Sequence, residues 1–272
     1  MTTYPNAKIN LGLNIVERRQ DGYHNIETIF YPIGIQDILN VEPSETCSDY
    51  SFSSSGIEVG GDPENNLIIK AYRLLRSQYQ FAPIDITLHK QIPFGAGLGG
   101  GSSDGAFMLK TLNELYGLKI TTKKLEKLPA KLETSCPFFI QNKPVYATGI
   151  GNIFTSVDLS LRGYWMLLVK PDIHVSTAEA YAGITPAQSE ISLTELIKLP
   201  VETWKKCIKN DFEKTVFEKH PGIGYLKDQI YGLGAVYASM SGSGSSVYGL
   251  FDEKPDIRGL FIGCYVACGE MD

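Results

Sequence analysis

Every second residue from Ala7 to Ile15 is apolar, and the residues between them are polar or glycine. This period of two predicts a half-buried β-strand, with Lys8 and Asn10 projecting together from the face opposite the apolar row. An Asp-Gly dipeptide at 21–22 follows, which is a strong turn signal. We therefore expect a hairpin whose second strand runs from about residue 23 to residue 33.

The rest of the chain mixes helical and strand patterns without a regular alternation, which predicts an α+β fold. Helices are expected at 67–75 (capped by Asn65 or Asn66), 107–116, 122–132 with an interruption at Pro129, 176–182, 192–199, 202–218 and 221–231. Strands are expected at 84–88, 145–148, 165–169, 235–240 and 246–251, with a final apolar segment at 261–267. Residues 43–64 are rich in Ser, Gly, Pro and acids, which indicates loop or irregular hairpins. The pattern lapses over 149–163, so we expect two domains, 1–155 and 156–272.

Residues 95–103 combine five glycines with two serines at the start of a predicted helix. Glycine lets the backbone approach a ligand closely, and a helix N-terminus presents unpaired N–H groups with a partial positive charge. Together these features indicate a phosphate-binding loop, in which Ser102 and Ser103 can add phosphate or magnesium contacts. A flexible, capped loop is the simpler alternative. No Lys follows the glycines, so the segment is not a Walker A loop, and its match to the dinucleotide fingerprint is weak.

A second loop of glycine and serine lies between two predicted strands at Ser241–Ser246. It is either a hairpin turn or a second place where backbone amides meet an anion. Two such loops, one in each expected domain, favour a ligand bound at the domain interface.

Composition and charge argue against several other classes of function. The 272 residues carry 25 Lys and Arg against 30 Asp and Glu, a formal charge of −5, which argues against nonspecific nucleic-acid binding. No apolar run is long enough for a membrane helix, and the first residues do not resemble a signal peptide. Five cysteines without a C-x-x-C pair indicate reduced cytoplasmic thiols rather than structural zinc. The sequence indicates no oligomeric state.

Three motifs in this order resemble the GHMP kinase superfamily, named for galactokinase, homoserine kinase, mevalonate kinase and phosphomevalonate kinase. They are the strand motif at 5–11, the loop Pro-x-Gly-x-Gly-Leu-Gly-Gly-Gly-Ser-Ser at 93–103, and the loop at 241–246. Asp21-Gly22-Tyr23-His24, with Asn66 and the segment 177–181, is similar to the branch that acts on a cytidyl-diphosphate methylerythritol. The resemblance covers about residues 4–250.

This resemblance implies a two-domain fold, with a left-handed βαβ crossover in the N-terminal domain and a ferredoxin-like C-terminal domain. It implies transfer of the γ-phosphoryl group of ATP, with Mg²⁺, to the 2-hydroxyl of that substrate in non-mevalonate isoprenoid precursor synthesis. Lys8 is implied as the catalytic cation beside the reacting groups. The implied ATP-binding residues are Asn66, Pro93, Gly95, Gly97, Leu98, Gly99, Gly100, Gly101, Ser102 and Ser103, with Ser103 also assigned to magnesium. The implied substrate-binding residues are Asn10, Tyr23, His24, Thr177, Tyr181, Ser241, Gly242, Ser243 and Gly244.

The chain departs from the family pattern at two places. Ser135 stands where the family has an aspartate, and Glu133 replaces the usual glycine. Three interpretations stay open: the protein is impaired or inactive and retains only ligand binding, Glu133 or Asp104 supplies the acid, or no base is essential. We predict a slow kinase. The second departure is at 253–260, which is too short for the family's long helix.

Three other functions remain as alternatives. One is a GHMP kinase that acts on a different small alcohol. Another is a catalytically weakened nucleotide-binding protein, which the serine at position 135 favours. A dinucleotide-dependent oxidoreductase is the third.

Overall fold

The computed structural model describes residues 1–59, 62–128 and 132–271, and the chain packs as two compact units. The first unit contains residues 1–7, 35–94 and 99–143, and the second contains residues 8–34, 95–98 and 144–272. Neither unit is contiguous in sequence, and the glycine-rich loop contributes residues to both. The domain boundary near residue 155 stays a prediction.

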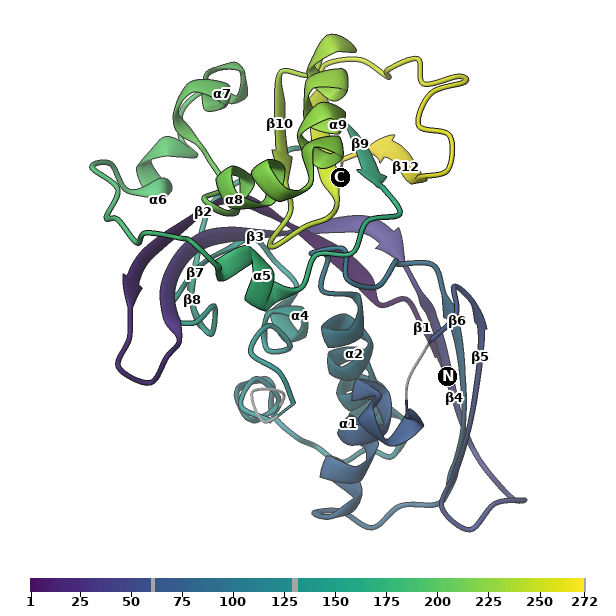
Figure 1. Cartoon of the computed structure of the whole chain (residues 1–272). Helices are drawn as coiled ribbons and strands as arrows, with labels where there is room; N and C mark the ends of the chain where they lie inside the picture. The colour runs from purple at the N-terminus through teal and green to yellow at the C-terminus, as the bar shows by residue number, and fades with distance from the viewer. Residues whose placement is uncertain (60–61, 129–131, 272) are drawn as a thin grey trace. The chain divides into compact units, whose positions relative to one another are not determined.

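A four-stranded sheet forms the frame of the first unit (Figure 1). Its order is β1 (Thr2–Thr3), β4 (Ile38–Pro43), β6 (Ile84–Lys90) and β5 (Tyr50–Gly56). β5 pairs with β6 in parallel and the other pairs are antiparallel, so the chain crosses over between β5 and β6 through the 3₁₀ helix η1 (Pro63–Asn65) and α1 (Leu67–Arg76). The hand of this crossover stays a prediction. The expectation of loop or irregular hairpins over 43–64 was wrong for β5, because pairing along its full length with β6 overrides its weak strand propensity.

The helices of the first unit are α1, α2 (Gly100–Leu115), α3 (Thr122–Leu125) and α4 (Phe138–Gln141). Asn66 caps α1 as predicted, since its Oδ1 accepts a hydrogen bond from Ile68 N at 2.9 Å. α1 and α2 pack against each other, and α2 also packs on β4. The predicted interruption at Pro129 lies outside the described residues.

One sheet of the second unit contains the predicted hairpin. Its order is β2 (Asn6–Arg18, whose first two residues belong to the first unit), β3 (His24–Gln36), β7 (Val145–Thr148) and β8 (Ile153–Ser156). β2 is not half-buried as its alternation suggested. The apolar row is buried, and Lys8 and Asn10 on the other row are only 6% and 3% exposed. A buried cation therefore needs polar partners.

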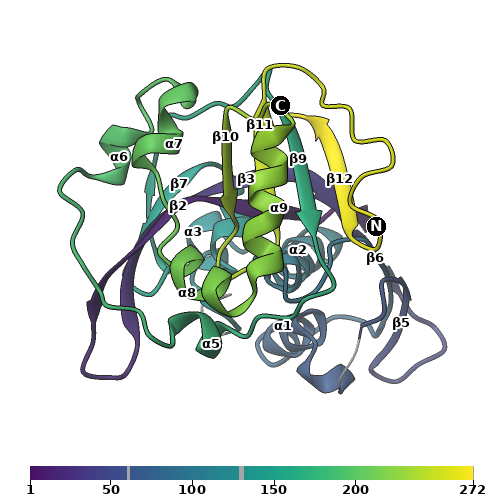
Figure 2. The same ribbon diagram turned by 45° about the horizontal axis from the view of Figure 1, so that its top comes forward.

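The other sheet of the second unit is antiparallel throughout. Its order is β10 (Tyr237–Met240), β11 (Val247–Phe251), β9 (Trp165–Lys170) and β12 (Tyr265–Glu270). The helices are α5 (Thr177–Tyr181), α6 (Leu193–Leu196), η3 (Val201–Thr203), α7 (Trp204–Cys207), α8 (Phe212–Lys219) and α9 (Pro221–Gly232). Figure 2 shows α9 lying along this sheet. The strand order is that of the expected ferredoxin-like domain. Residues 252–264, all of which are described, contain no helix, so the predicted absence of a long helix before the last strand is confirmed. The connection is longer than the predicted 253–260, because β12 begins at Tyr265.

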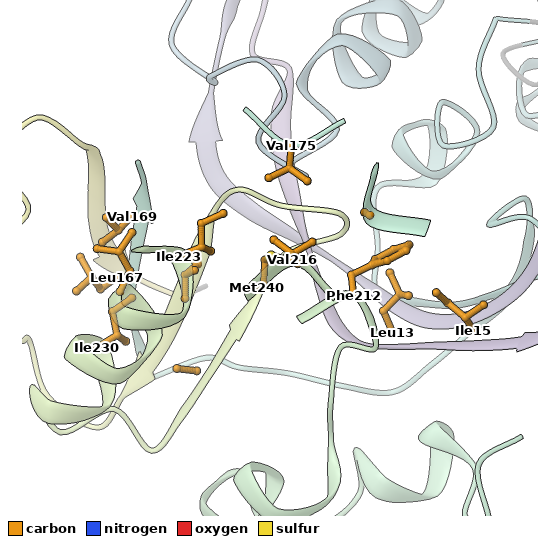
Figure 3. Packing of buried hydrophobic residues seen from close by; sticks show 14 of the residues in the cluster. Leu13, Ile15, Leu167, Val169, Val175, Phe212, Val216, Ile223, Ile230 and Met240 are labelled. Atoms are coloured by element: carbon orange, nitrogen blue, oxygen red, sulfur yellow. The ribbon is translucent and has the colours of Figure 1, made fainter. Parts of the chain in front are cut away.

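The apolar core of the second unit lies between α8, α9 and this antiparallel sheet, and it also takes in residues of β2 and β3 (Figure 3). Buried members from the sheet include Leu167 and Met240, and Val216 and Ile230 face them from the two helices. Among the described residues, no helix has the length and apolarity needed to cross a membrane.

The helix predicted over 202–218 is broken between α7 and α8. Residues 209–211 instead pair with strand β2, because Leu13 N donates to Lys209 O and Asp211 N donates to Leu13 O, both at 2.8 Å. Backbone groups that pair with a strand cannot also make helical hydrogen bonds, so residues 209–211 are not helical.

Candidate functional site

Lys8 lies buried in the second unit with its ammonium group held by two oxygen atoms. Its Nζ donates to Asn10 Oδ1 and to Gly97 O, each at 2.6 Å. It also lies 5.3 Å from the centre of the Phe30 ring. The lysine is thus fixed against the first half of the glycine loop, and Asn10 joins it as the alternation predicted.

Residues 95–98 are packed directly against the second loop, within the second unit. Ser241 Oγ donates to Gly97 O at 2.9 Å, and the amides of Ser245 and Ser246 donate to Gly95 O and Ala96 O. A Cβ atom placed on Gly97 would lie 1.9 Å from Ser241 O, and its φ of +72° is also unfavourable for other residues. Residues 95–98 and the loop 241–246, about 145 positions apart in sequence, therefore pack against each other through hydrogen bonds.

The second half of the glycine loop opens helix α2 in the first unit. Gly99 occupies the N-cap position without a side-chain cap, and Ser102 follows in the first turn. Ser102 Oγ donates to Glu133 Oε2 at 2.7 Å and lies 2.9 Å from Ser135 Oγ. Ser103 Oγ is fully buried and has no hydrogen-bond partner among the described residues. The first turn of α2 therefore carries two serine hydroxyls close to its N-terminal backbone amides.

The two carboxylates that could replace the expected aspartate are in different surroundings. Glu133 is exposed and contacts Ser102 and, at 3.4 Å, Ser135. Asp104 is buried and accepts a hydrogen bond from Lys90 Nζ at 2.7 Å. Burial raises the pKa of Asp104. Only Glu133 of these two contacts the hydroxyls that begin α2.

The predicted cytosine-binding residues are partly brought together in the second unit. The His24 and Tyr181 rings stack with centres 4.6 Å apart at 16°, and Tyr181 meets Phe212 edge-on at 4.8 Å. Burial raises the pKa of Tyr181. Tyr23 is 61% exposed with no ring contact among the described residues, and Thr177 is the exposed first residue of α5.

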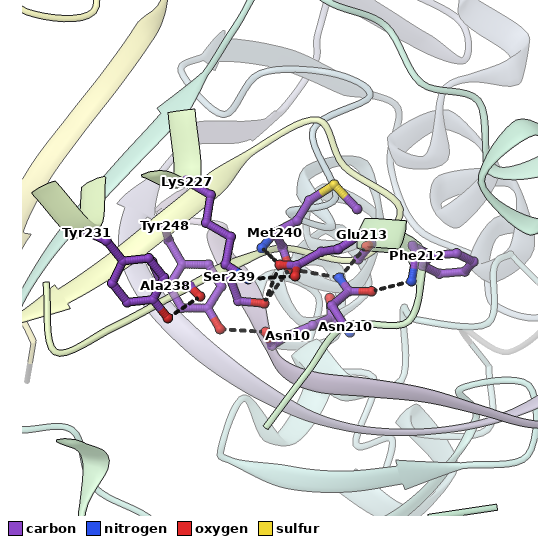
Figure 4. A network of polar contacts seen from close by, with 11 residues as sticks. Asn10, Asn210, Phe212, Glu213, Lys227, Tyr231, Ala238, Ser239, Met240 and Tyr248 are labelled. Carbon is purple, nitrogen blue, oxygen red and sulfur yellow. Dashed lines mark hydrogen bonds and ion pairs between the residues drawn. The ribbon is translucent and has the colours of Figure 1, made fainter. Parts of the chain in front are cut away.

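Several polar residues that the sequence did not single out support this arrangement (Figure 4). Asn10 Nδ2 donates to Thr28 Oγ1 at 2.9 Å, and Tyr248 OH donates to Asn10 O at 2.7 Å. Asn210 Nδ2 donates to Met240 O and Gly242 O, each at 2.8 Å. In the sequence, the signal that could have identified Asn210 was the Asn-Asp pair at 210–211 inside a predicted helix, since both residues are weak helix formers.

Magnesium was assigned to Ser103, and the donor set permits only part of a site. In the described portion of the chain, no three His, Cys, Asp or Glu side chains are grouped to hold a metal. Magnesium usually keeps several waters and binds through one or two protein groups together with substrate phosphates. The unpartnered Ser103 hydroxyl fits such a minor role, with the phosphates supplying most of the ligands.

Comparison with known proteins gives two family matches and several relatives. Residues 66–141 match the family model described as "GHMP kinases N terminal domain", and residues 192–259 match "GHMP kinases C terminal". A relative from Bacteroides fragilis named 4-diphosphocytidyl-2-C-methyl-D-erythritol kinase is 54% identical over 258 residues, covering 94% of each chain. A relative of the same name from Parabacteroides distasonis is 53% identical over 274 residues, covering 100% of each.

Solved structures agree with these matches. A crystal structure of 4-(cytidine 5'-diphospho)-2C-methyl-D-erythritol kinase superposes with a TM-score of 0.86 and 29% identity, covering 100% of this chain and 99% of that one. Mevalonate kinase from Methanococcus jannaschii gives a TM-score of 0.67 at 16% identity, covering 100% and 98%. The second likeness concerns the fold alone.

Proposed function

Because this chain belongs to the GHMP kinases, we propose that it transfers the γ-phosphoryl group of ATP to the 2-hydroxyl of 4-diphosphocytidyl-2-C-methyl-D-erythritol. The observation that carries the proposal is the identity of 53–54%, over nearly the whole chain, to relatives named for that activity. Non-mevalonate isoprenoid precursor synthesis is the corresponding pathway. The alternative of a dinucleotide oxidoreductase is set aside, because the family is a family of kinases.

Lys8 is proposed as the catalytic cation. Its Nζ is held by Asn10 Oδ1 and Gly97 O, so the charge needs little reorganisation when the transferring phosphoryl group develops negative charge. The surrounding apolar strand residues exclude water, which strengthens an electrostatic contact.

The α2 N-terminus is proposed as the ATP phosphate site. The residues that would contribute amides or hydroxyls are Gly99, Gly100, Gly101, Ser102 and Ser103, with Pro93, Gly95, Gly97, Leu98 and Asn66 in the wider nucleotide site. Magnesium would neutralise phosphate charge there, with Ser103 as one protein contact. Asn66 already uses its Oδ1 as a helix cap, so its proposed contact with ATP would come from its remaining groups.

The stacked rings of His24 and Tyr181 are proposed to recognise cytosine, with Tyr23 and Thr177 nearby in sequence. Their stacking on each other supports an aromatic platform, since a base prefers a flat, offset partner. Asn10 and the loop residues Ser241, Gly242, Ser243 and Gly244 would contact the rest of the substrate. We also place the reaction in the cytoplasm, a proposal supported by five free thiols.

Ser135 leads us to propose a slow enzyme. A serine hydroxyl is a poor general base, and general base catalysis contributes about 10²- to 10⁴-fold. Phosphoryl transfer depends mainly on positioning and charge stabilisation, so the remaining groups support turnover. Ser135→Asp is expected to raise kcat within that range, measured as ADP formation. The matched variant Glu133→Gln tests whether the exposed carboxylate already supplies part of this effect, and unchanged turnover in both would contradict a missing base.

A second candidate is a protein that binds both ligands without transferring phosphate, and Ser135 is the observation that favours it. The deciding experiment is ADP formation by the purified protein with ATP, magnesium and the cytidyl substrate, with mevalonate and homoserine as controls. Turnover confined to the cytidyl substrate supports the proposed kinase. Tight binding of both ligands without ADP supports the second candidate. Turnover with a control alcohol instead supports a GHMP kinase of different specificity.

A further inference from the structure

The segment Asn210–Glu213 contains the end of the break between α7 and α8 and the first two residues of α8, where the sequence predicted an unbroken helix. Its four residues contact three different parts of the candidate site in the second unit: strand β2, the loop 241–246 and the stacked aromatic rings. We call it the positioning segment. The segment contains no glycine, and its role follows from its contacts.

Asn210 fixes the start of the loop 241–246. Its side chain is 3% exposed, and its Nδ2 donates both hydrogens, one to Met240 O and one to Gly242 O, at 2.8 Å each. Its Oδ1 accepts from Phe212 N at 3.0 Å. The amide therefore bridges the two carbonyls on either side of Ser241, and Figure 4 shows Asn210 beside Met240. No other type of side chain of this size offers the same two donors and one acceptor.

Glu213 holds the backbone N–H of Met240, the residue whose carbonyl group Asn210 contacts. Its Oε1 accepts from Met240 N at 2.8 Å and from Ser239 Oγ at 3.2 Å, and its Oε2 accepts from Lys227 Nζ at 2.6 Å. Both backbone groups of Met240 are thus held by the positioning segment, one by Glu213 and one by Asn210. The last residue of β10 enters the loop in a single defined orientation.

The two middle residues hold the strand and the rings. Asp211 Oδ2 accepts from Ile15 N at 2.7 Å, and Asp211 N donates to Leu13 O, so the segment is fixed to β2. The Phe212 ring packs edge-on against Tyr181, which stacks on His24. Strand β2 is the strand that carries Lys8 and Asn10.

The loop 241–246 connects the positioning segment to the proposed catalytic lysine through Gly97. Ser241 Oγ donates to Gly97 O, which also accepts from Lys8 Nζ. From these contacts we infer that the positioning segment sets the geometry of the reaction centre through Asn210 and that of the base-binding rings through Phe212. Asn210 and Glu213 are positioning residues and do not themselves touch reacting atoms. This inference rests on the proposed function.

Asn210→Asp is the primary test. Aspartate keeps the oxygen that accepts from Phe212 N but places a second oxygen against the carbonyls of Met240 and Gly242. We expect kcat to fall about 10- to 100-fold, because misplacement by ~1 Å can cost about 100-fold. KM for the cytidyl substrate is expected to change by less than about threefold, since the rings keep their contacts. Amides of residues 241–246 are expected to exchange hydrogen faster, measured by mass spectrometry.

Two further variants separate positioning from general destabilisation. Phe212→Leu removes the ring contact with Tyr181 but leaves the Asn210 amide, so it is expected to raise KM about tenfold with a smaller change in kcat. Ile230→Val removes one methylene from the core of the same unit and is the control for lost stability. It is expected to leave both constants and the exchange of residues 241–246 unchanged.

The outcomes distinguish this inference from the proposed function. If the wild-type protein forms no ADP from any substrate, the proposed function fails and exchange at 241–246 alone decides the positioning role. If Asn210→Asp folds with unchanged kcat and unchanged exchange, the inference is wrong. An equal fall in kcat in Ile230→Val would also overturn it. Should Asn210→Asp fail to fold, Glu213→Gln takes its place, with the same loop exchange and kcat as readouts and smaller expected changes.

Discussion

Residues 95–98 and residues 99–103 are neighbours in one glycine-rich loop, yet they belong to different compact units and are held by different interactions. The first half is held by neutral hydrogen bonds from the loop 241–246 and by the ammonium group of Lys8. The second half starts α2 beside a buried cluster of charges. A Cβ atom on Gly100 would lie 3.1 Å from Lys90 Nζ.

The buried cluster consists of Lys90, Asp37 and Asp104, whose side chains are between 0% and 4% exposed. Lys90 Nζ donates to both carboxylates, and Asp37 Oδ1 also accepts from Ile92 N at 2.8 Å. Two buried lysines thus lie near the two halves of one loop, in different surroundings. Lys90 Nζ donates to carboxyl groups inside the first unit, whereas Lys8 Nζ donates to two neutral oxygens, Asn10 Oδ1 and Gly97 O.

Lys90→Met is expected to have the largest effect on stability. It leaves the buried carboxyl groups of Asp37 and Asp104 without the cation that contacts both of them. Breaking a buried ion pair typically costs about 3–5 kcal/mol. Urea unfolding measures the loss. Lys198→Met is the matched control, since its exposed pair with Glu195 is worth at most about 1 kcal/mol. Equal losses in the two variants would show that the cluster is not stabilising.

Lys8→Met is expected to change kcat strongly and the free energy of unfolding less. Lys90→Met is expected to show the opposite pattern. Removing a preorganised charge-stabilising group typically costs about 10²- to 10³-fold in kcat. ADP formation and urea unfolding are measured on the same samples. Lys8→Arg keeps the charge and is expected to lose less turnover than Lys8→Met. Wild-type turnover in Lys8→Met would exclude the lysine from the reaction.

Local patterns predicted the parts of this arrangement that depend on neighbouring residues. The alternation from Ala7 to Ile15 predicted the strand with Lys8 and Asn10 on one face, and Asn66 is one of the two residues predicted to cap the first helix. The glycine density at 95–101 indicated close backbone approach. These features follow from strand period, capping and φ preference, each of which acts over a few residues.

Long-range contacts explain what the sequence did not reveal. β5 exists because β6 offers it a complete row of partners, and the break at 208–211 exists because β2 binds that backbone. Asn210 looked like a helix residue, although its amide holds carbonyls 30 and 32 positions away. The Glu133 contact with Ser102 joins residues 31 positions apart. No periodic pattern encodes such pairings, since they depend on how separate elements pack.

Gly97→Ala sharpens the comparison of the two loop halves. The new methyl group would collide with Ser241 O in a left-handed conformation, and overpacking of this kind costs about 1–3 kcal/mol. Gly101→Ala is its partner, since the nearest atom to its Cβ, Leu67 Cδ1, is 3.7 Å away. A helical alanine there is expected to change stability by no more than about 1 kcal/mol, in the stabilising direction. Equal destabilisation in thermal unfolding would mean that both halves use glycine for the same reason.

Asp104→Asn tests the charged half of the loop through the pH dependence of stability. Burial, and to a lesser degree Asp37, raises the pKa of Asp104 above its ordinary value of 3.8. A raised pKa in the folded state means that the stabilisation is complete below the ordinary pKa and is lost as pH rises toward the raised one. Asparagine mimics the protonated acid and does not titrate. The variant should therefore gain stability relative to the wild type between about pH 5 and pH 8.

The difference in the free energy of unfolding between Asp104→Asn and the wild type changes by at most about 1.4 kcal/mol per pH unit, because one group titrates. Glu64→Gln is the control of opposite sign in the same unit, because hydrogen bonds from Arg73 lower the pKa of Glu64 to about 2. Its contribution is present above the ordinary pKa of 4.5 and is lost only as pH falls below it, so its difference from the wild type stays flat from about pH 5 to pH 8. If Asp104→Asn is equally flat over that range, Asp104 is ionised throughout, and Lys90 then compensates two buried negative charges rather than one.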